Sequence, residues 1–139
     1  MNSLQQLEDE RFLIGQVVKG KQLGRTIGFP TANLEVNVGT YLENGVYGLY
    51  VFIQGKRYFG VMNIGKRPTF NDGEHSTYEV YILDFNENIY QEMLTIEIKF
   101  YIRPEQKFNQ LQDLVQQLRA DVFHARKQFH LLNKYWRIE

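Results

Sequence analysis

The segment from Leu94 to Arg103 cannot form an amphipathic helix, because its apolar residues recur at every second position. A period of two puts successive side chains on opposite faces, as in a β-strand with one buried face. Five earlier segments rich in β-branched and aromatic residues are separated by glycine-containing turns, so we predict an antiparallel barrel or sandwich without intervening helices. The six predicted strands are Phe12–Lys19, Asn33–Val38, Val46–Gln54, Arg57–Ile64, Thr77–Phe85 and Leu94–Arg103, with a hairpin turn at Gly55-Lys56.

The hydrophobic period changes after Asn109, and the residues that follow predict one long amphipathic helix. Asn109 is suited to the N-cap position, and Gln112 three residues later completes a capping-box pattern. We expect the helix to pack across the strands and to end near Asn133, leaving 134–139 as a C-terminal tail that is either further helix or loose chain. Its apolar face consists of Leu111, Leu114, Val115, Leu118, Val122, Ala125 and Phe129.

Composition narrows the class of protein. A chain of 139 residues suits one domain, here residues 12–133, preceded by a linker or frayed segment at 1–11. Lys and Arg together number 16, as do Asp and Glu, so no overall field attracts nucleic acid or an anionic membrane. No apolar segment approaches the roughly 20 residues of a membrane span. Cysteine is absent, which excludes disulfides and thiolate metal sites, and we expect a cytoplasmic protein.

The stretch LGRTIGFPTANL, Leu23 to Leu34, places glycines and a proline directly before Thr31 and Asn33. One interpretation is an ordinary turn that enters a strand. The other is an anion site, in which free backbone amides and the charges of Lys21 and Arg25 face a phosphate. Thr31 and Asn33 alternate along the start of a strand, so their oxygen-bearing side chains project to one face. Such hard oxygen ligands suit magnesium, and the residues alone leave both interpretations open.

Several motifs together resemble the riboflavin kinase (flavokinase) family. They are GQVVKGKQLGRTIGFPTANL, VMNIGKRPTF, YEVYILDF and YIRPEQKF, which occur in this order before an amphipathic helix. The resemblance covers about residues 12 to 127. It implies a six-stranded antiparallel, Greek-key-like β-barrel with a long C-terminal α-helix, and an enzyme that transfers the γ-phosphate of ATP to riboflavin, giving FMN and ADP. In bacteria this domain is usually the C-terminal half of a bifunctional enzyme that also makes FAD.

The resemblance also implies site residues. Glu79 is expected to be the catalytic base, and Thr31 and Asn33 are expected to hold Mg²⁺ on the ATP phosphates. ATP-binding residues are expected at Gly20, Lys21, Arg25, Thr31 and Asn33, and flavin-binding residues at Ile82, Asp84, Ile96 and Arg103.

Two positions and one missing segment depart from the family pattern. Tyr81 stands where a histidine is common, and Gln91 follows Tyr90 where a glycine is usual. No motif of the adenylyltransferase half is present, so FAD synthesis is not expected from this chain alone. A fused or separate adenylyltransferase domain is the expected protein partner.

Glu79 stands out even without the resemblance. It lies between Tyr78 and Val80 in an almost uncharged run, where β-propensity disfavours Glu, and it shares a strand face with Tyr81 and Leu83. An exposed strand carboxylate without a chemical role is the alternative. We also predict that the loops Gly20 to Gly28 and Arg67 to Ser76, rich in Gly, Asn, Asp and charge, close over the ligands.

Two rival functions remain at this point. A barrel of this size with 14% aromatic residues could bind single-stranded nucleic acid, although the zero net charge argues against it. The other rival is a catalytically inactive flavin- or nucleotide-binding barrel with a sensing role.

Overall fold

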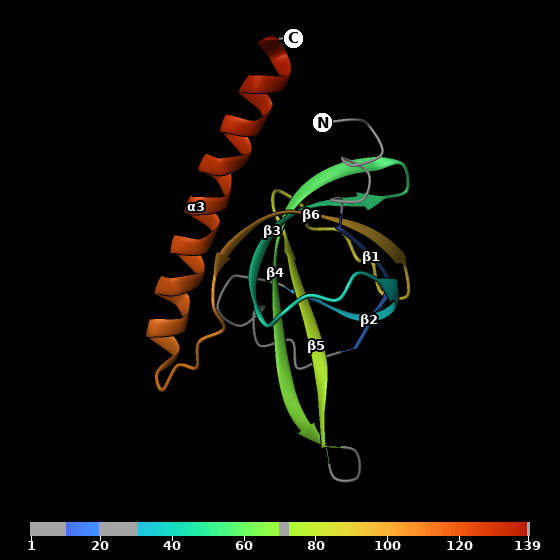
Figure 1. Cartoon of the computed structure of the whole chain (residues 1–139), viewed down its shortest axis with the longest axis vertical. Helices are drawn as coiled ribbons and strands as arrows, with labels where there is room; N and C mark the ends of the chain where they lie inside the picture. The colour runs from blue at the N-terminus through green and yellow to red at the C-terminus, as the bar shows by residue number, and fades with distance from the viewer. Residues whose placement is uncertain (1–10, 20–30, 70–72, 139) are drawn as a thin grey trace.

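The computed structural model describes residues 11–19, 31–69 and 73–138. Over these ranges the chain forms six antiparallel strands that close into a barrel, followed by one long C-terminal helix (Figure 1). The predicted barrel with a C-terminal helix is therefore confirmed. The elements are β1 (Arg11–Val18), β2 (Ala32–Gly39), β3 (Gly45–Ile53), β4 (Lys56–Thr69), β5 (Gly73–Ile82), β6 (Met93–Arg103) and α3 (Leu111–Ile138).

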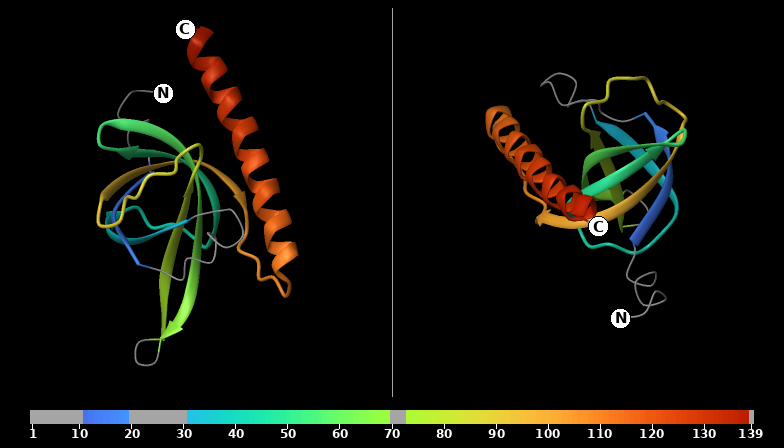
Figure 2. Two further views of the ribbon diagram at one scale, coloured as in Figure 1. Left: turned by 180° about the vertical axis from the view of Figure 1, so that it is seen from behind. Right: turned by 90° about the horizontal axis from the view of Figure 1, so that it is seen from above.

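The strands follow the order β1-β2-β5-β4-β3-β6 around the barrel, and β6 pairs with β1 to close it. The three consecutive strands β3, β4 and β5 are neighbours, and β6 returns to lie beside β3, which is a Greek key. Viewed along the barrel, α3 lies outside the ring of strands (Figure 2). This arrangement leaves the outer face of β3, β4 and β6 available for packing against the helix.

Two apolar layers result from this arrangement. The inward side chains of all six strands fill the barrel, and among them Leu49, Met62 and Ile96 are completely buried. A second cluster lies between the outer face and α3, where the Phe129 ring stacks on Phe59 with centroids 4.3 Å apart. Because both faces of β3 are covered, that strand is apolar almost throughout rather than alternating.

The β3–β4 hairpin turns at Gln54 and Gly55, whose φ angles are 49° and 81°. Two central residues with positive φ form the turn that matches the twist of a two-residue hairpin. The predicted turn at Gly55-Lys56 was thus misplaced by one residue, because Lys56 already pairs with Ile53.

The β4–β5 hairpin is longer than predicted and extends away from the barrel (Figure 1). Antiparallel pairing continues from Gly65↔Thr77 to Thr69↔Gly73, even through Pro68. The predicted loop from Arg67 to Ser76 is therefore wrong over its described residues, which are strand. Proline and glycine indicate loops on average, but here Pro68 and Gly73 are paired at the outer end of a hairpin, where proline is tolerated. The other predicted lid, Gly20 to Gly28, lies outside the described residues.

Helix α3 begins at Leu111, one residue later than an N-cap at Asn109 predicts. The carbonyl of Gln110 accepts hydrogen bonds from the amides of Asp113 and Leu114, so Gln110 occupies the N-cap position instead of Asn109. The helix continues past Asn133 to Ile138, so residues 134–138 are helix and do not form a separate tail. No helix in the described part of the chain is long and apolar enough to cross a membrane.

Candidate active site

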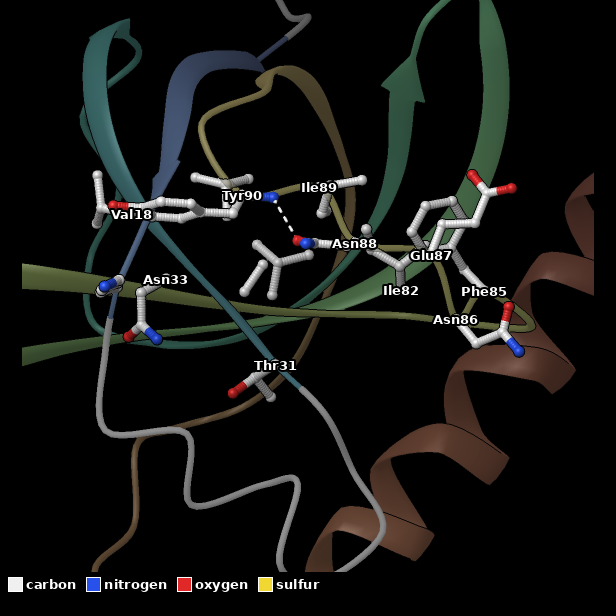
Figure 3. A pocket seen from close by; sticks show the side chains of 14 residues that line it. Val18, Thr31, Asn33, Ile82, Phe85, Asn86, Glu87, Asn88, Ile89 and Tyr90 are labelled. Carbon is white, nitrogen blue, oxygen red and sulfur yellow. Dashed lines mark hydrogen bonds between the residues drawn. The ribbon is translucent and has the colours of Figure 1, made fainter.

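Thr31, Asn33 and Glu79 come together on the outer face of the barrel. Thr31 directly precedes β2, and Asn33 on β2 is the cross-strand partner of Glu79 on β5. Directly opposite residues of an antiparallel pair face the same side, with Cβ atoms about 4.5–5.5 Å apart. Figure 3 shows the side chains of Thr31 and Asn33 projecting to the same side of the chain. The predicted same-face arrangement therefore holds, and it includes the carboxylate of Glu79.

A cavity of about 490 Å³ opens at one end of the barrel, and we name it the mouth pocket (Figure 3). Its walls are the end of β1, the start of β2, the inward residues Val80 and Ile82, and the connection 85–90 between β5 and β6. Thr31 and Asn33 both line it, as does Lys19, whose ammonium lies 5.7 Å from the centroid of the Tyr90 ring. A positive charge beside hydroxyl and amide groups suits an anionic ligand.

The wall formed by residues 85–90 is held in place by local contacts. The Tyr90 amide donates to Asn88 Oδ1 at 3.0 Å, and the Gln91 amide donates to the carbonyl of Val17 at 2.9 Å. Phe85 packs edge-on against Tyr58 with centroids 4.9 Å apart. Gln91 has a φ of 70°, a left-handed conformation that favours glycine, which explains why a glycine is usual at this position.

A second, smaller cavity of about 130 Å³ lies between the outer face of the barrel and α3, and we name it the seam pocket. The sheet side contributes Thr31, Asn63, Glu79 and Tyr81 among others. The helix side contributes mainly apolar residues, among them Leu114, Leu118 and Val122. The sheet wall thus combines polar residues with Val46 and Val61, and the helix wall is apolar except for Asp121. Thr31 lines both pockets and marks the point at which they meet.

The seam pocket is braced by a bidentate ion pair. Arg103 Nε and Nη2 donate to the two carboxylate oxygens of Asp121, each at 2.8 Å. Asp121 is only 2% exposed, and Gln117 Nε2 donates to the same carboxylate at 3.0 Å. Arg103 also donates through Nη1 to the carbonyl of Pro104. The guanidinium therefore lines the seam pocket while most of its hydrogen-bonding capacity fixes α3 to the end of β6.

Asp84 forms a second tie to the helix. Arg126 donates from Nη1 and Nη2 to its two carboxylate oxygens at 3.0 and 2.9 Å. These hydrogen bonds hold the pKa of Asp84 below its usual value. Because Asp84 immediately precedes residues 85–90, the pair connects one wall of the mouth pocket to the helix that covers the seam pocket. Both side chains remain well exposed, at 74% and 48%.

The structure separates the four residues expected to surround a flavin. Arg103 lines the seam pocket, whereas Ile82 lines the mouth pocket. Asp84 lies in neither pocket and forms a solvent-exposed ion pair with Arg126. Ile96 is completely buried inside the barrel and lines neither pocket. Because Ile96 faces the inside of the barrel, the structure does not bring it to the seam pocket, and its contact with a flavin stays a prediction. Gly20, Lys21 and Arg25 lie outside the described residues.

The oxygen ligands available at the junction fit a hard cation only in part. Among the described residues there is no group of three or more His, Cys, Asp or Glu side chains that could hold a metal ion. The Thr31 hydroxyl and the Asn33 amide oxygen are the ligand types that magnesium accepts while it keeps waters and phosphate oxygens. Magnesium at this place would therefore depend on a phosphate ligand.

Sequence reasoning missed three parts of the site. Residues 85–90 follow no period, so nothing in the pattern marks them as a pocket wall. Asp121 was detectable as a carboxylate beside the apolar stripe of the helix, between Leu118 and Val122. Asn63 was detectable as a lone amide between apolar strand residues.

The geometry agrees with comparisons to known proteins. A family model described as "Flavokinase: Riboflavin kinase" matches residues 7–129. The "RNA-binding riboflavin kinase RibR" of Bacillus subtilis is 42% identical over 120 residues, which is 86% of this chain and 52% of that protein. A "Bifunctional riboflavin kinase/FMN adenylyltransferase" of Haemophilus influenzae is also 42% identical, over 85% of this chain and 38% of its own length.

A solved structure is similar as well. The riboflavin kinase from Trypanosoma brucei superimposes with a TM-score of 0.57 and 27% identity, covering 87% of this chain and 80% of that one. The chain spans about half the length of the B. subtilis relative, and less of the H. influenzae relative.

Proposed function

The chain belongs to the riboflavin kinase family, and we propose that it transfers the γ-phosphoryl group of ATP to the 5′-hydroxyl of riboflavin, giving FMN and ADP. The observation that carries this proposal is the cross-strand pair Asn33↔Glu79 at the junction of the two pockets. A kinase must bring a nucleotide and an acceptor together at one point, and Thr31 lines both cavities there. Phosphoryl transfer depends mainly on such positioning and on charge neutralisation.

ATP would occupy the mouth pocket. Its volume of about 490 Å³ lies within the usual range for ligand cavities, about 300–1,000 Å³. Lys19 supplies positive charge there, and Thr31 and Asn33 offer oxygen ligands for Mg²⁺ on the phosphates. The magnesium ion would neutralise the negative charge of the transferring group. In the protein, Thr31 and Asn33 orient the nucleotide so that the γ-phosphate lies toward Glu79.

Riboflavin would occupy the seam pocket. The apolar side chains of α3 suit a flat aromatic ring, and the polar sheet wall suits the hydroxylated ribityl chain. A cavity of about 130 Å³ is smaller than the ring requires, so the seam has to widen when the ligand enters. The C-terminal half of α3 is anchored by the stacked Phe129, whereas Leu114 and Leu118 near its N-terminus line the cavity. The ion pair of Asp121 with Arg103 also holds the helix to β6, so widening would occur in the first turns of α3, before Asp121.

Glu79 would act as the general base. It accepts the proton of the riboflavin 5′-hydroxyl as that oxygen attacks the γ-phosphorus, and the bond from this phosphorus to the β,γ-bridging oxygen breaks. The electrons of the broken bond remain on ADP. Water must be excluded from the junction, because it would otherwise accept the phosphoryl group.

A direct assay tests the proposed function. The purified chain is incubated with riboflavin and Mg-ATP, and flavins are separated by chromatography. FMN formation with stoichiometric ADP is the expected result, without FAD, because conversion of FMN to FAD would need a fused or separate adenylyltransferase. Binding of riboflavin without FMN formation would instead identify an inactive flavin-binding barrel.

A further inference from the structure

Three polar residues cross the outer face of the barrel in one row. Asn33 on β2 is opposite Glu79 on β5, and Glu79 is in turn opposite Asn63 on β4. Side chains of directly opposite residues share a face, with Cβ atoms about 4.5–5.5 Å apart. Asn63 therefore flanks the carboxylate of Glu79 on the side away from Asn33. Asn63 and Glu79 both line the seam pocket, whereas Asn33 lines the mouth pocket.

Asn63 is an unusual residue for its position. Its chain neighbours Met62 and Ile64 are completely buried in the barrel, and asparagine is disfavoured in the middle of a strand. Asn63 is half-buried, and its side chain makes no hydrogen bond to any other residue that the structure describes. A half-buried amide can still bond to water, but an amide that is buried without a partner costs about 1–3 kcal/mol. A ligand that displaces water from the seam pocket would therefore have to bond to Asn63 itself.

The chemistry of that partner follows from the two walls of the pocket. Leu114, Leu118 and Val122 on the helix side offer no hydrogen bonds, so they suit the ring of a flavin. Asn63 and Glu79 on the sheet side suit the hydroxyl-bearing part of the same ligand. An asparagine amide has two N–H donors and a carbonyl acceptor, so it can bind hydroxyl groups in either sense.

We propose that Asn63 binds the ribityl chain of riboflavin and thereby holds the terminal hydroxyl against Glu79. This inference rests on the proposed function and adds a residue that determines which flavins are accepted. A polar site built to bind hydroxyl groups rejects an analogue that lacks them, because its own polar groups then stay unpaired. Asn63 thus distinguishes riboflavin from flavins that carry the ring alone.

Two ligands separate a chain contact from a ring contact. Riboflavin carries the ribityl chain, and lumiflavin has the same ring with a methyl group in its place. Dissociation constants are measured by the change in flavin fluorescence for the parent and for Asn63→Ala, in the presence of Mg-ADP. We expect Asn63→Ala to weaken riboflavin binding about threefold to tenfold, as the loss of one or two hydrogen bonds predicts, and to leave lumiflavin binding unchanged.

Matched variants make the result decisive. Asn63→Ser keeps a hydroxyl at the site and should recover part of the riboflavin affinity. Asn37→Ala, at an exposed position of β2 outside both pockets, should bind both flavins like the parent. Thermal unfolding of each variant identifies any loss of fold. If Asn63→Ala does not fold, the dissociation constants of riboflavin and lumiflavin are compared between Asn63→Ser and the parent instead.

The outcomes that overturn the inference are distinct from failure of the proposed function. Equal weakening of riboflavin and lumiflavin by Asn63→Ala, or no weakening of either, would show that Asn63 does not contact the ribityl chain, although the parent still makes FMN. A parent that neither binds riboflavin nor makes FMN would remove the proposed function, and the role of Asn63 with it.

Discussion

The mouth pocket and the seam pocket meet at Thr31 but are built in opposite ways. One wall of the mouth pocket is the irregular connection formed by residues 85–90. This connection carries three polar side chains, those of Asn86, Glu87 and Asn88. The seam pocket lies between the sheet and α3, with Gln106 and Phe108 of the β6–α3 connection also lining it, and its helix side is largely apolar. The mouth pocket therefore suits a charged ligand, and the seam pocket suits a flat, apolar ligand.

This difference indicates how the protein divides the work of a phosphoryl transfer. Under the proposed function, the charged ligand would bind where an irregular connection supplies polar side chains. The aromatic ring would bind between the sheet and the helix, where the lining is more apolar. The proposed reaction would take place where the two pockets meet, and the strand pairing of Asn33 with Glu79 fixes the spacing of these two residues there.

The largest expected effect is that of a substitution at Glu79, which lies where the two pockets meet. Glu79→Gln keeps the shape of the side chain but cannot accept the proton, so turnover should fall by a factor of about 10² to 10⁴. Binding of riboflavin and Mg-ATP should change little, because the hydrogen-bonding reach is retained. Steady-state kinetics and fluorescence titration measure the two effects separately. Glu35→Gln, an exposed carboxylate on β2, is the control and should behave as the parent. Near-normal turnover in Glu79→Gln would mean that another group is the base.

Asn33 tests the mouth pocket alone. Asn33→Ala removes an oxygen ligand beside Thr31, and the loss of one interaction with a charged group corresponds to about 1.5–3 kcal/mol, or roughly 10- to 150-fold in ATP use. The KM for Mg-ATP should rise and the magnesium requirement should shift upward, while riboflavin binding is retained. A magnesium titration of activity, with Asn37→Ala as the control, measures this. Full activity of Asn33→Ala at every magnesium concentration would exclude it as a metal ligand.

Sequence patterns predicted the parts of the site that lie on strands, and the reason is geometric. A period of two fixes which face of a strand a residue occupies, so it places Thr31 and Asn33 on one face. The expected roles of these residues and of Glu79 came from the family resemblance. What the pattern does not contain is register. Only the pairing of β4 with β5 shows that Asn63 lies beside Glu79.

Contacts between elements that are distant in the sequence could not be predicted from the sequence pattern either. The ion pair between Arg103 and Asp121 depends on where α3 crosses the barrel, which no sequence pattern contains. The strand pattern likewise does not tell which face of β6 is the inner one, and the structure places Ile96 in the core. The left-handed backbone of Gln91 was signalled only by the family's usual glycine at that position.

Leu118 tests the seam pocket alone. Leu118→Trp places a larger side chain in a cavity of about 130 Å³ that already has to widen for a flavin. Overpacking of this kind costs about 1–3 kcal/mol, so riboflavin affinity should fall about fivefold to 150-fold while Mg-ADP binding is kept. Leu131→Trp, at a more exposed position of the same helix, is the matched control. If both substrates weaken together in Leu118→Trp, the two pockets are not separate sites.

The smallest expected effect concerns the ion pair of Asp84 with Arg126, which connects the wall at residues 85–90 to α3. Its loss should change the stability of the fold. Asp84 has a φ of 55°, which asparagine tolerates almost as well, so Asp84→Asn removes the charge with little backbone strain. Hydrogen bonds from Arg126 lower the pKa of Asp84 from its ordinary value of 3.8. A carboxylate with a lowered folded-state pKa stabilises the fold above its unfolded pKa, and the stabilisation is lost as the pH falls through the folded value. Both side chains are solvent-exposed, so screening limits the contribution of the ion pair to stability to about 0.2–1 kcal/mol.

Urea unfolding at pH 7 should therefore show Asp84→Asn less stable than the parent by this amount. The difference in free energy of unfolding should disappear below pH 3.8 and in 1 M salt. A gap that stays the same at low pH would mean that asparagine acts through the backbone or the loop rather than through the lost charge.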